Sequence, residues 1–356
     1  MGRYRKQQIT FFLTNHCNLY CDYCYVCRQN SQIKKLDINF AKCGINDFFN
    51  SNNSRWIRFF AEGEPTLEFF LMKQIRDYAY GLVGDKLRIE LQTNGYFSQE
   101  IAKWISKNVD MVWFSHDGPN IHDKHRKTLK GEPSSQLIER NILFLAKNEN
   151  LVVGVRSSIS SDNVKNQKEM VDFFSKLGVK AVAVDPIFKK VGSENEPSID
   201  LLDFAKNFLI AKKRADELNI FYTSILTTNF DEKVNIHCQA CIPCPHLTPD
   251  GFVSACDLAT SGNTSLKEFI YGKYNQEKNK IDYFDKKMRS LQSRNTDNLA
   301  KCQNCEVLHN CAGGCLGETL NECGNLFEIR KSVCPAIKYL AKNMERNTKR
   351  DPYFHP

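Results

Sequence analysis

The stretch that decides the fold is FFLTNHCNLYCDYCYVC, residues 11–27. It places Cys17, Cys21 and Cys24 in a Cys-x3-Cys-x2-Cys array, directly after an apolar run typical of a β-strand, residues 9–13. Three thiolates on one short loop can hold three irons of a cubane 4Fe-4S cluster, because cysteine thiolates are the ligands of such clusters. The fourth iron then has no protein ligand, and an open metal position is where a small molecule can bind and react. A zinc site or a redox-active thiol pair could also use these cysteines.

Beyond this loop, apolar β-rich runs alternate with amphipathic helical stretches as far as about residue 218. Such alternation predicts an α/β fold in which βα units build a parallel sheet. The expected strands are residues 8–14, 56–61, 87–93, 111–115, 151–158 and 181–187. The expected helices are residues 38–49, 68–82, 99–107, 135–147, 167–177 and 201–218.

Short polar motifs directly follow the expected strands. EGEP, residues 62–65, follows the second strand, NG at 94–95 follows the third, and HDGP at 116–119 follows the fourth. Ligands bind at the carboxyl ends of the strands in parallel α/β sheets. Together with the cysteine loop, these motifs therefore predict one shared mouth, although each motif alone is also an ordinary turn former.

The C-terminal third carries a second dense set of cysteines. They are Cys238, Cys241, Cys244, Cys256, Cys302, Cys305, Cys311, Cys315, Cys323 and Cys334. The chain has 15 cysteines in all and no apolar signal-peptide core in its first residues, MGRYRKQQ. This combination favours metal binding or catalysis over a disulfide framework. Two zinc ions with four thiolates each would be one use for the C-terminal set.

The composition is that of an ordinary globular protein, with 42% hydrophobic and 25% charged residues. No apolar run approaches the ~20 residues needed to span a bilayer. The net charge of +8 comes without a basic run interleaved with aromatic residues, and a lysine-rich solvated surface explains it. We therefore expect a cytoplasmic protein that binds neither membrane nor nucleic acid.

On these motifs the sequence resembles the radical S-adenosylmethionine (radical SAM) superfamily. Its signature is the cysteine spacing above with an aromatic residue before the last cysteine, here Tyr23. AEGEPTLE at 61–68, LQTNGY at 91–96 and FSHDGPNIHDKHR at 114–126 resemble its GGEP, TNG and SxDGP stretches. The sequence departs from the first of these at Glu62, where the family usually has glycine.

The C-terminal cysteines, with Gly251 ahead of Cys256, resemble the seven-cysteine pattern of the SPASM domain. The relatives that combine both parts are peptide-modifying maturases such as the anaerobic sulfatase-maturating enzymes. The resemblance implies a partial (β/α)6 TIM barrel at residues 1–220, a small Cys-rich iron-sulfur (SPASM) domain at residues 221–345 and a tail at 346–356.

The resemblance also implies S-adenosylmethionine (SAM) and three 4Fe-4S clusters, one that binds SAM and two that are auxiliary. The first would use Cys17, Cys21 and Cys24. One auxiliary cluster would use Cys241, Cys256 and Cys315, with either Cys238 or Cys244 as fourth ligand, and the other Cys302, Cys305, Cys311 and Cys334. The implied contacts to SAM are Tyr23, Glu62, Gly63, Glu64, Pro65, Asn94, Arg156 and Ser158.

An activity follows from the same resemblance: a 5'-deoxyadenosyl radical would abstract a hydrogen atom from a side chain of a ribosomally made peptide, leading to a thioether or carbon-carbon cross-link. Sulfatase maturation to formylglycine is the alternative, and a non-enzymatic iron-sulfur electron carrier is another. Asp257 would be the catalytic base, and His116 would contact the substrate. Cys27, Cys43 and Cys323 have no assigned role.

The expected partners are a precursor peptide or protein, an electron donor such as ferredoxin or flavodoxin, and a separate leader-peptide-binding protein. The first strand begins near residue 8, so we expect no fused N-terminal peptide-binding domain, and leader recognition, where it is needed, would come from the barrel surface or from that separate partner.

Overall fold

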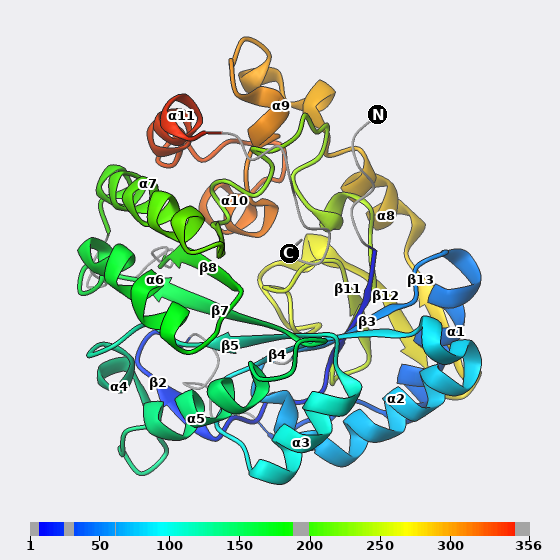
Figure 1. The fold of residues 1–356 in the computed structure, drawn as a ribbon. Coiled ribbons are helices and arrows are strands. Elements are labelled where there is room, and N and C mark those ends of the chain that lie inside the picture. Colours follow the sequence, from blue (N-terminus) through cyan, green and yellow to red (C-terminus); the bar gives the residue numbers. More distant parts are fainter. Residues whose placement is uncertain (1–6, 25–31, 61, 188–198, 346–356) are drawn as a thin grey trace.

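The computed structural model describes residues 7–24, 32–60, 62–187 and 199–345. Within these ranges one curved sheet of 11 strands runs through the molecule, in the order β13-β12-β11-β10-β1-β3-β4-β5-β7-β8-β9 (Figure 1). The six strands expected from the sequence are confirmed as β1 (Ile9–Phe12), β3 (Trp56–Phe60), β4 (Arg88–Thr93), β5 (Met111–Ser115), β7 (Val152–Ile159) and β8 (Ala181–Pro186). All six are parallel to their neighbours, as βα units require.

The six expected helices are also confirmed. They are α1 (Ile38–Ser51), α2 (Phe69–Val83), α3 (Gln99–Asn108), α5 (Ser135–Leu145), α6 (Gln167–Lys176) and α7 (Leu201–Glu217). Aspartates fix the start of the first and the last, because the Asp37 carboxylate accepts from the amides of Asn39 and Phe40, and Asp200 does the same for α7. In Figure 1 these helices lie around the outer side of the curved sheet.

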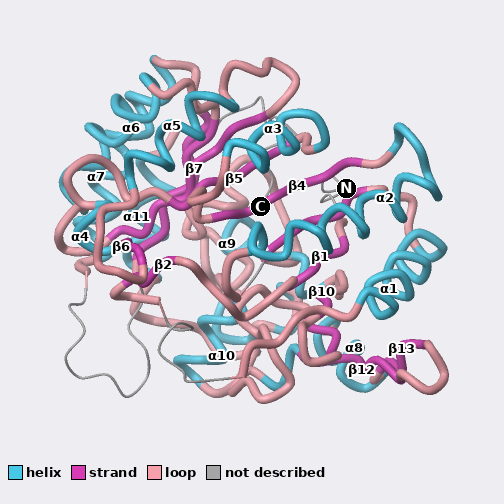
Figure 2. The backbone as a smooth tube through the Cα atoms, turned by 90° about the horizontal axis from the view of Figure 1, so that it is seen from below, coloured by secondary structure: helices cyan, strands magenta, loops and turns pink. Residues whose placement is uncertain are grey.

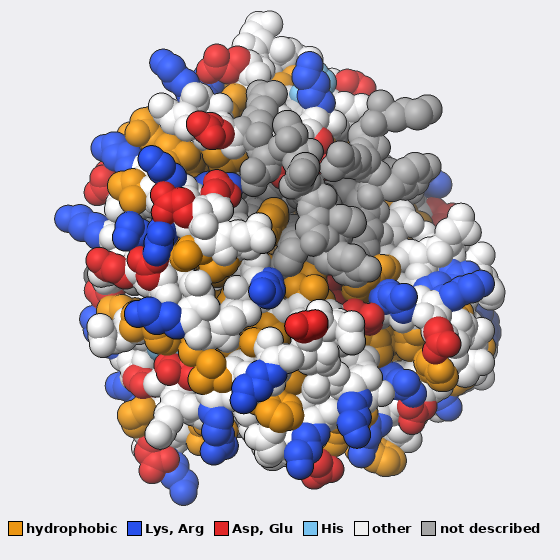
Figure 3. All heavy atoms as spheres, in the orientation of Figure 1, with side chains coloured by type: hydrophobic (Ala, Val, Ile, Leu, Met, Phe, Trp, Pro, Cys, Tyr) orange, Lys and Arg blue, Asp and Glu red, His pale blue; other side chains and the backbone are white. Residues whose placement is uncertain are grey.

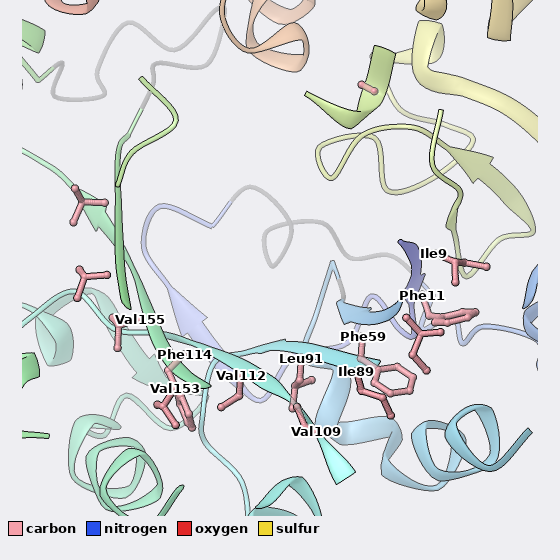
Figure 4. Packing of buried hydrophobic residues seen from close by; sticks show 14 of the residues in the cluster. Ile9, Phe11, Phe59, Ile89, Leu91, Val109, Val112, Phe114, Val153 and Val155 are labelled. Atoms are coloured by element: carbon pink, nitrogen blue, oxygen red, sulfur yellow. The ribbon is translucent and has the colours of Figure 1, made fainter. Parts of the chain in front are cut away.

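The core lies between this outer ring of helices and the sheet. The strand β1 reads ITFF and is buried along its whole length, as expected for a parallel strand covered on both faces. Figure 4 shows Phe11, Phe59, Leu91 and Val112 from four successive strands lying in one row on the sheet. This packing fixes the strand ends, and so the loops that follow them.

The sequence did not predict that the sheet continues past its six central strands. A seventh parallel strand, β9 (Phe221–Thr223), adds to β8 at one edge. At the other edge β10 (His246–Leu247) pairs in parallel with β1, with Thr10 opposite His246. The antiparallel strands β11 (Phe252–Ser254), β12 (Ile270–Asn275) and β13 (Lys280–Tyr283) then continue from β10.

The C-terminal helices are short and lie on the side of the molecule opposite α2 and α3 in Figure 1. They are α8 (Asp285–Gln292), α9 (Leu308–Cys311), α10 (Leu316–Cys323) and α11 (Cys334–Asn343). The last of them packs against α7. Figure 2, turned by 90°, shows how much of this cysteine-rich part is loop, and its buried apolar side chains, such as Leu316 and Leu340, belong to the same core cluster as those of the sheet.

Two features bear on partners and location. Basic and acidic side chains are interspersed over the described part of the face seen in Figure 3, in line with a solvated charged surface. Among the residues that the structure describes, no helix is long and apolar enough to cross a membrane.

Candidate functional site

The cysteine loop begins where β1 ends and is anchored by a small second sheet. The strand β2 (Leu19–Cys21) pairs antiparallel with β6 (Arg126–Thr128), with Cys21 opposite Arg126. A tight turn follows, in which the amide of Cys24 donates to the carbonyl of Cys21 at 3.0 Å. Burial raises the pKa of the Cys21 thiol to about 11, and the nearby thiols of Cys24 and Cys17 act in the same direction. The three cysteines are therefore neighbours, as their spacing predicted.

The loop after β3 lies directly against the cysteine loop. The amide of Gly63 donates to the carbonyl of Thr14 at 3.1 Å, and the amide of Glu64 donates to the carbonyl of His16 at 2.7 Å. A Cβ atom on Gly63 would lie 1.9 Å from the carbonyl oxygen of His16. Only glycine fits at this close approach, which sets the position of the chain immediately before Cys17.

Glu64 joins the loop after β3 to the loop after β4. Its carboxylate is 1% exposed and accepts four hydrogen bonds. Oε1 accepts from the amide and hydroxyl of Thr66 at 3.0 and 2.6 Å and from the hydroxyl of Thr93 at 2.6 Å, and Oε2 accepts from the amide of Asn94 at 2.7 Å. Burial raises the pKa of Glu64, and these hydrogen bonds only partly offset the effect. Both oxygens of the side chain are thus bonded within the protein.

Asn94 brings the third loop to the cysteines. The side-chain nitrogen Nδ2 of Asn94 lies 3.6 Å from Sγ of Cys17 and donates to Oδ1 of Asn18 at 2.8 Å. Asn18 in turn donates to the carbonyl of Tyr96 at 2.8 Å. Two successive βα loops are therefore bonded to the loop that carries the cysteines.

A buried carboxylate, Asp117, ties in the fourth loop. The Tyr23 hydroxyl donates to it, Nε of Arg126 donates to Oδ2 at 2.9 Å, and the amide of Ser158 donates to Oδ1 at 3.0 Å. Burial alone would raise the pKa of Asp117, but Arg126 and the Tyr23 hydroxyl outweigh it and the pKa is lowered. The predicted contacts Tyr23 and Ser158 thus come together on a carboxylate whose positioning role we did not predict. The DGP stretch with its following arginine was the signal that could have revealed it.

Glu62 and Pro65 complete the second loop. Glu62, where the related motif has glycine, is half-buried, and Thr260 in the C-terminal region is near enough to its carboxylate to lower the pKa. Burial raises the pKa of Glu62, with Cys24 among the groups that add to the effect. Pro65 is buried and begins a 3-10 turn. The second loop therefore lies between the cysteine loop and the C-terminal region.

Arg156 lies near the carboxyl end of β7. Its Nη2 donates to Oδ2 of Asp185 at 3.2 Å, and its side chain is 30% exposed. Asp185 also accepts from the amide of Ile225 at 2.6 Å. Arg156 is thus held at the strand ends with part of its side chain open to the solvent.

Asp257 lies next to a buried barrel arginine. The Nη2 group of Arg58 on β3 donates to its Oδ1, and Nδ1 of His246 on β10 lies 3.7 Å from the same oxygen. Burial alone would raise the pKa of Asp257, but Arg58 and His246 outweigh it and the pKa is lowered. Since Asp257 follows Cys256, this ion pair fixes one C-terminal cysteine against the sheet. Arg58, an unpredicted member of the site, gave no sequence signal beyond being a charge inside a buried strand.

His116 is not placed as predicted. It is 0% exposed and packs against the rings of Phe173 and Phe174 on α6 and His122, at ring-centre distances of 5.6, 5.5 and 4.1 Å. Its Nδ1 accepts from the amide of Gly118 at 3.1 Å. Because the side chain points to the helix side of the strand, it is unable to contact a substrate at the mouth, and it supports the fourth loop instead.

A first group of C-terminal cysteines forms around Cys256 and Cys315. Burial raises the pKa of Cys315 to about 12, and the nearby Cys238 acts in the same direction. Cys256 is near both of them. The amide of Cys241 donates to the carbonyl of Cys238 at 3.2 Å, which places these two on one turn.

Within the described ranges, no other cysteine is among the groups that act on the thiol of Cys244. Burial raises the pKa of its thiol to about 11, and the backbone of Gln8 and the charge of Arg58 oppose the effect. Cys43 and Cys323 are each near a backbone carbonyl, of Asn279 at 3.6 Å and of Ile329 at 3.8 Å. Cys27 falls outside the described residues.

The second C-terminal group lines one hollow. Cys302, Cys305, Cys311 and Cys334 all contribute to its wall, together with apolar side chains such as Ile337. Burial raises the pKa of Cys311 to about 12, and Cys334, Cys302 and Cys305 add to the effect. Cys302, Cys305, Cys311 and Cys334 are free thiols, and within the described ranges no three Cys, His, Asp or Glu side chains are close enough to share a single metal ion. Groups of three and four neighbouring thiols are the donor sets that 4Fe-4S clusters require.

Similar proteins were found by comparison of the amino-acid sequence with those of known proteins. No protein-family model matches the chain. It is 25% identical to the radical SAM cyclopropyl synthase TigE of Paramaledivibacter caminithermalis, over 94% of this chain and 73% of that one. It is 22% identical to the serine-type anaerobic sulfatase-maturating enzyme of Klebsiella aerogenes, over 87% and 79%. An uncharacterized protein of Methanocaldococcus jannaschii is 31% identical over 175 residues. This matched stretch is 49% of the present chain and 60% of the length of that protein.

Solved structures share the fold over most of the chain. The structure of anSMEcpe with bound AdoMet has a TM-score of 0.73 and 19% identity, covering 94% of this chain and 92% of that one. Streptococcus suis SuiB bound to S-adenosylmethionine has a TM-score of 0.66 and 15% identity, covering 93% and 77%. The expected α/β architecture with its Cys-rich C-terminal region is thereby confirmed.

Proposed function

We propose, from the place of this chain among the radical SAM enzymes with a SPASM-type C-terminal region, that it oxidatively modifies or cross-links a side chain of a ribosomally made peptide. The product would carry a new thioether or carbon-carbon bond. A 4Fe-4S cluster at Cys17, Cys21 and Cys24, with SAM on its open iron, would supply a 5'-deoxyadenosyl radical that abstracts a hydrogen atom.

One observation carries this proposal. Three further βα loops are bonded to the cysteine loop through Gly63, Asn94 and Asp117. An electron carrier needs only a bound cluster, whereas four loops held around one open metal position build a site for a second molecule. Peptides are bound in related structures, namely anSMEcpe with the Cp18Cys peptide and SuiB with its precursor peptide SuiA.

The residues predicted to contact SAM fall into two groups, those whose side chains are hydrogen-bonded between loops and those that keep a free surface. Glu64, Tyr23 and Ser158 are engaged in hydrogen bonds between loops, so we propose that they hold the loops in place. The backbone of residues 62–65 would then offer the contacts to SAM, with Asn94 beside Cys17. Arg156 keeps an exposed part and would meet the SAM carboxylate or ribose.

Two auxiliary 4Fe-4S clusters complete the proposed cofactor set. We assign Cys238, Cys241, Cys256 and Cys315 to one and Cys302, Cys305, Cys311 and Cys334 to the other. Cys238 is preferred over Cys244 because it lies near Cys256 and Cys315. The clusters would accept the electron left after hydrogen abstraction or bind the substrate directly. The proposed units are a barrel of residues 1–220 and a cluster-binding part of residues 221–345.

Asp257 keeps its proposed role as proton acceptor, with a constraint from its neighbours. Arg58 and His246 hold it as a carboxylate, which a base requires. The same pairing makes it a weaker base than a free carboxylate, so it would act on a proton already made acidic in the substrate radical. A carboxylate in this place also suits the second candidate function, the maturation of a sulfatase serine or cysteine. One of the similar proteins is a serine-type anaerobic sulfatase-maturating enzyme.

The proposed partners are the peptide substrate, an electron donor such as ferredoxin or flavodoxin, and a separate leader-binding protein. The first experiment is to count iron and sulfide in anaerobically reconstituted protein, then to add SAM and dithionite and assay for 5'-deoxyadenosine. Three clusters predict about twelve irons per chain. Replacing Cys17, Cys21 and Cys24 by alanine should remove about a third of the iron and all SAM cleavage. Zinc in place of iron, or iron without SAM cleavage, would contradict the proposal.

A further inference from the structure

Arg294, just after α8, is among the largest fully buried side chains of the described residues, with 0% exposure. Nε donates to the carbonyl of Leu326 at 2.6 Å, and Nη1 donates to the carbonyl of Ala312 at 3.0 Å. Nη2 has no hydrogen-bond partner within the described part of the chain, and no carboxylate is among the charged groups that act on the guanidinium there. Burying a cation in this way is unfavourable unless a negative group compensates the charge.

The backbone around this guanidinium is shaped to admit it. Ala312, Gly313 and Gly314 have φ angles of +46°, +79° and +76°, three successive residues in the left-handed region. A Cβ atom on Gly313 would lie 2.4 Å from Nη2, so any other residue would displace the unpartnered group. A non-glycine residue with positive φ is uncommon and costs energy. The turn between Cys311 and Cys315 therefore adopts a costly conformation that keeps a place for Nη2.

The groups that could compensate the charge of Arg294 are cysteines. Burial lowers the pKa of Arg294, and the groups that oppose this are Cys241 and Cys238 from the first C-terminal group and Cys302 and Cys311 from the second. The guanidinium is hydrogen-bonded to the turn that joins Cys311 of the second group to Cys315 of the first, and thiols of both groups act on its charge. Thiolates that bind iron are anionic, so loaded cysteines would supply the compensation that the protein lacks.

We propose that Arg294 is a positioning residue that keeps a permanent positive charge between the two auxiliary clusters, with Nη2 available to donate to their sulfur atoms. The inference rests on the proposed cofactor set. Net charge and hydrogen bonds to sulfur are principal determinants of cluster potential, and a nearby cation stabilises the more negative, reduced state. Arg294 therefore raises the reduction potential of at least one auxiliary cluster, which makes that cluster a better acceptor of the substrate's electron.

The test uses full-length protein in which Cys17, Cys21 and Cys24 are alanine, so that only C-terminal iron contributes. Iron content and midpoint potentials, the latter from EPR-monitored titration, are compared for Arg294 intact, Arg294→Met and Arg294→Lys. Arg289→Met, at an exposed arginine on α8, is the matched control. We expect at least one lower midpoint in Arg294→Met, a smaller decrease in Arg294→Lys and none in the control.

Unchanged midpoints in an iron-replete Arg294→Met protein would overturn the inference while leaving the proposed cofactors intact. Absence of iron with Arg294 intact would overturn both. If Arg294→Met loses its iron, Arg294→Lys decides the matter: recovery of iron supports a requirement for charge, and equal loss in both variants shows that the side chain acts by packing alone.

Discussion

Replacing Gly63 by alanine should separate the two loops on which the active site depends. The new Cβ would lie 1.9 Å from the carbonyl oxygen of His16, 2.3 Å from its carbon and 2.7 Å from its nitrogen. Ordinary contact begins at 3.4 Å, so the segments must separate by about 1.5 Å. All three atoms are backbone, which leaves no side chain to rotate away.

The cost follows from the contacts that this separation breaks. Two hydrogen bonds are lost, from Gly63 to Thr14 and from Glu64 to His16, each contributing about 0.5–1.5 kcal/mol. Overpacking of a close contact adds about 1–3 kcal/mol. We therefore expect a loss of about 2–6 kcal/mol in the free energy of unfolding. Because His16 precedes Cys17, SAM cleavage should fall together with stability.

The assay compares denaturant unfolding, iron content and 5'-deoxyadenosine formation in Gly63→Ala with those of Gly81→Ala. Gly81 is an exposed glycine of α2 with no atom within 4 Å of its added Cβ, so its replacement should be neutral or stabilise the helix by up to ~1 kcal/mol. A Gly63→Ala protein with unaltered stability and SAM cleavage would refute the close approach of the two loops.

Three further results are expected. Cys238→Ser should lower the iron content by up to one cluster whereas Cys244→Ser should not, measured on the reconstituted proteins; the reverse order would reverse our choice of ligand. Asp257→Asn leaves the buried guanidinium of Arg58 without its negatively charged partner, which is itself 38% exposed, so denaturant unfolding should show a loss of about 1–3 kcal/mol, and a stability equal to that of the unsubstituted protein would show that the charge pair contributes nothing. Burial, His116 and Arg126 lower the pKa of His122 from 6.5 to about 2, with Asp117 and Asp123 opposing, so the fold requires the neutral ring. The unfolded chain binds this proton near pH 6.5 and the folded chain does not, so stability should fall by up to ~1.4 kcal/mol per unit as pH drops below 6.5, and this slope should be shallower in His122→Asn.

The first cysteine group was readable from the sequence because its three members are close together along the chain. The spacing of Cys17, Cys21 and Cys24 places three thiols on one loop whatever follows. The alternation of apolar strands with amphipathic helices fixed the six βα units to within a few residues, since each period is a local property. The motifs after the strands then had to meet at one edge, because parallel strands end on the same side.

The tertiary structure decided which of these residues interact. The pairing of Arg58 with Asp257 joins positions 199 residues apart, and β10 is a two-residue strand that no periodicity could reveal. His116 faces the helices because strand β5 sets its direction, which overturned its predicted contact with the substrate.

In the C-terminal region, too, only the tertiary structure shows the neighbours of Arg294. Its place between two cysteine groups depends on how the loops around residues 238–241, 302–315 and 326 fold over one another, and its sequence neighbours give no sign of it. Sequence patterns specify which ligands and loops a chain has, since these depend on spacing and period. Charge compensation in a buried site depends on three-dimensional neighbours, and only the folded chain determines these.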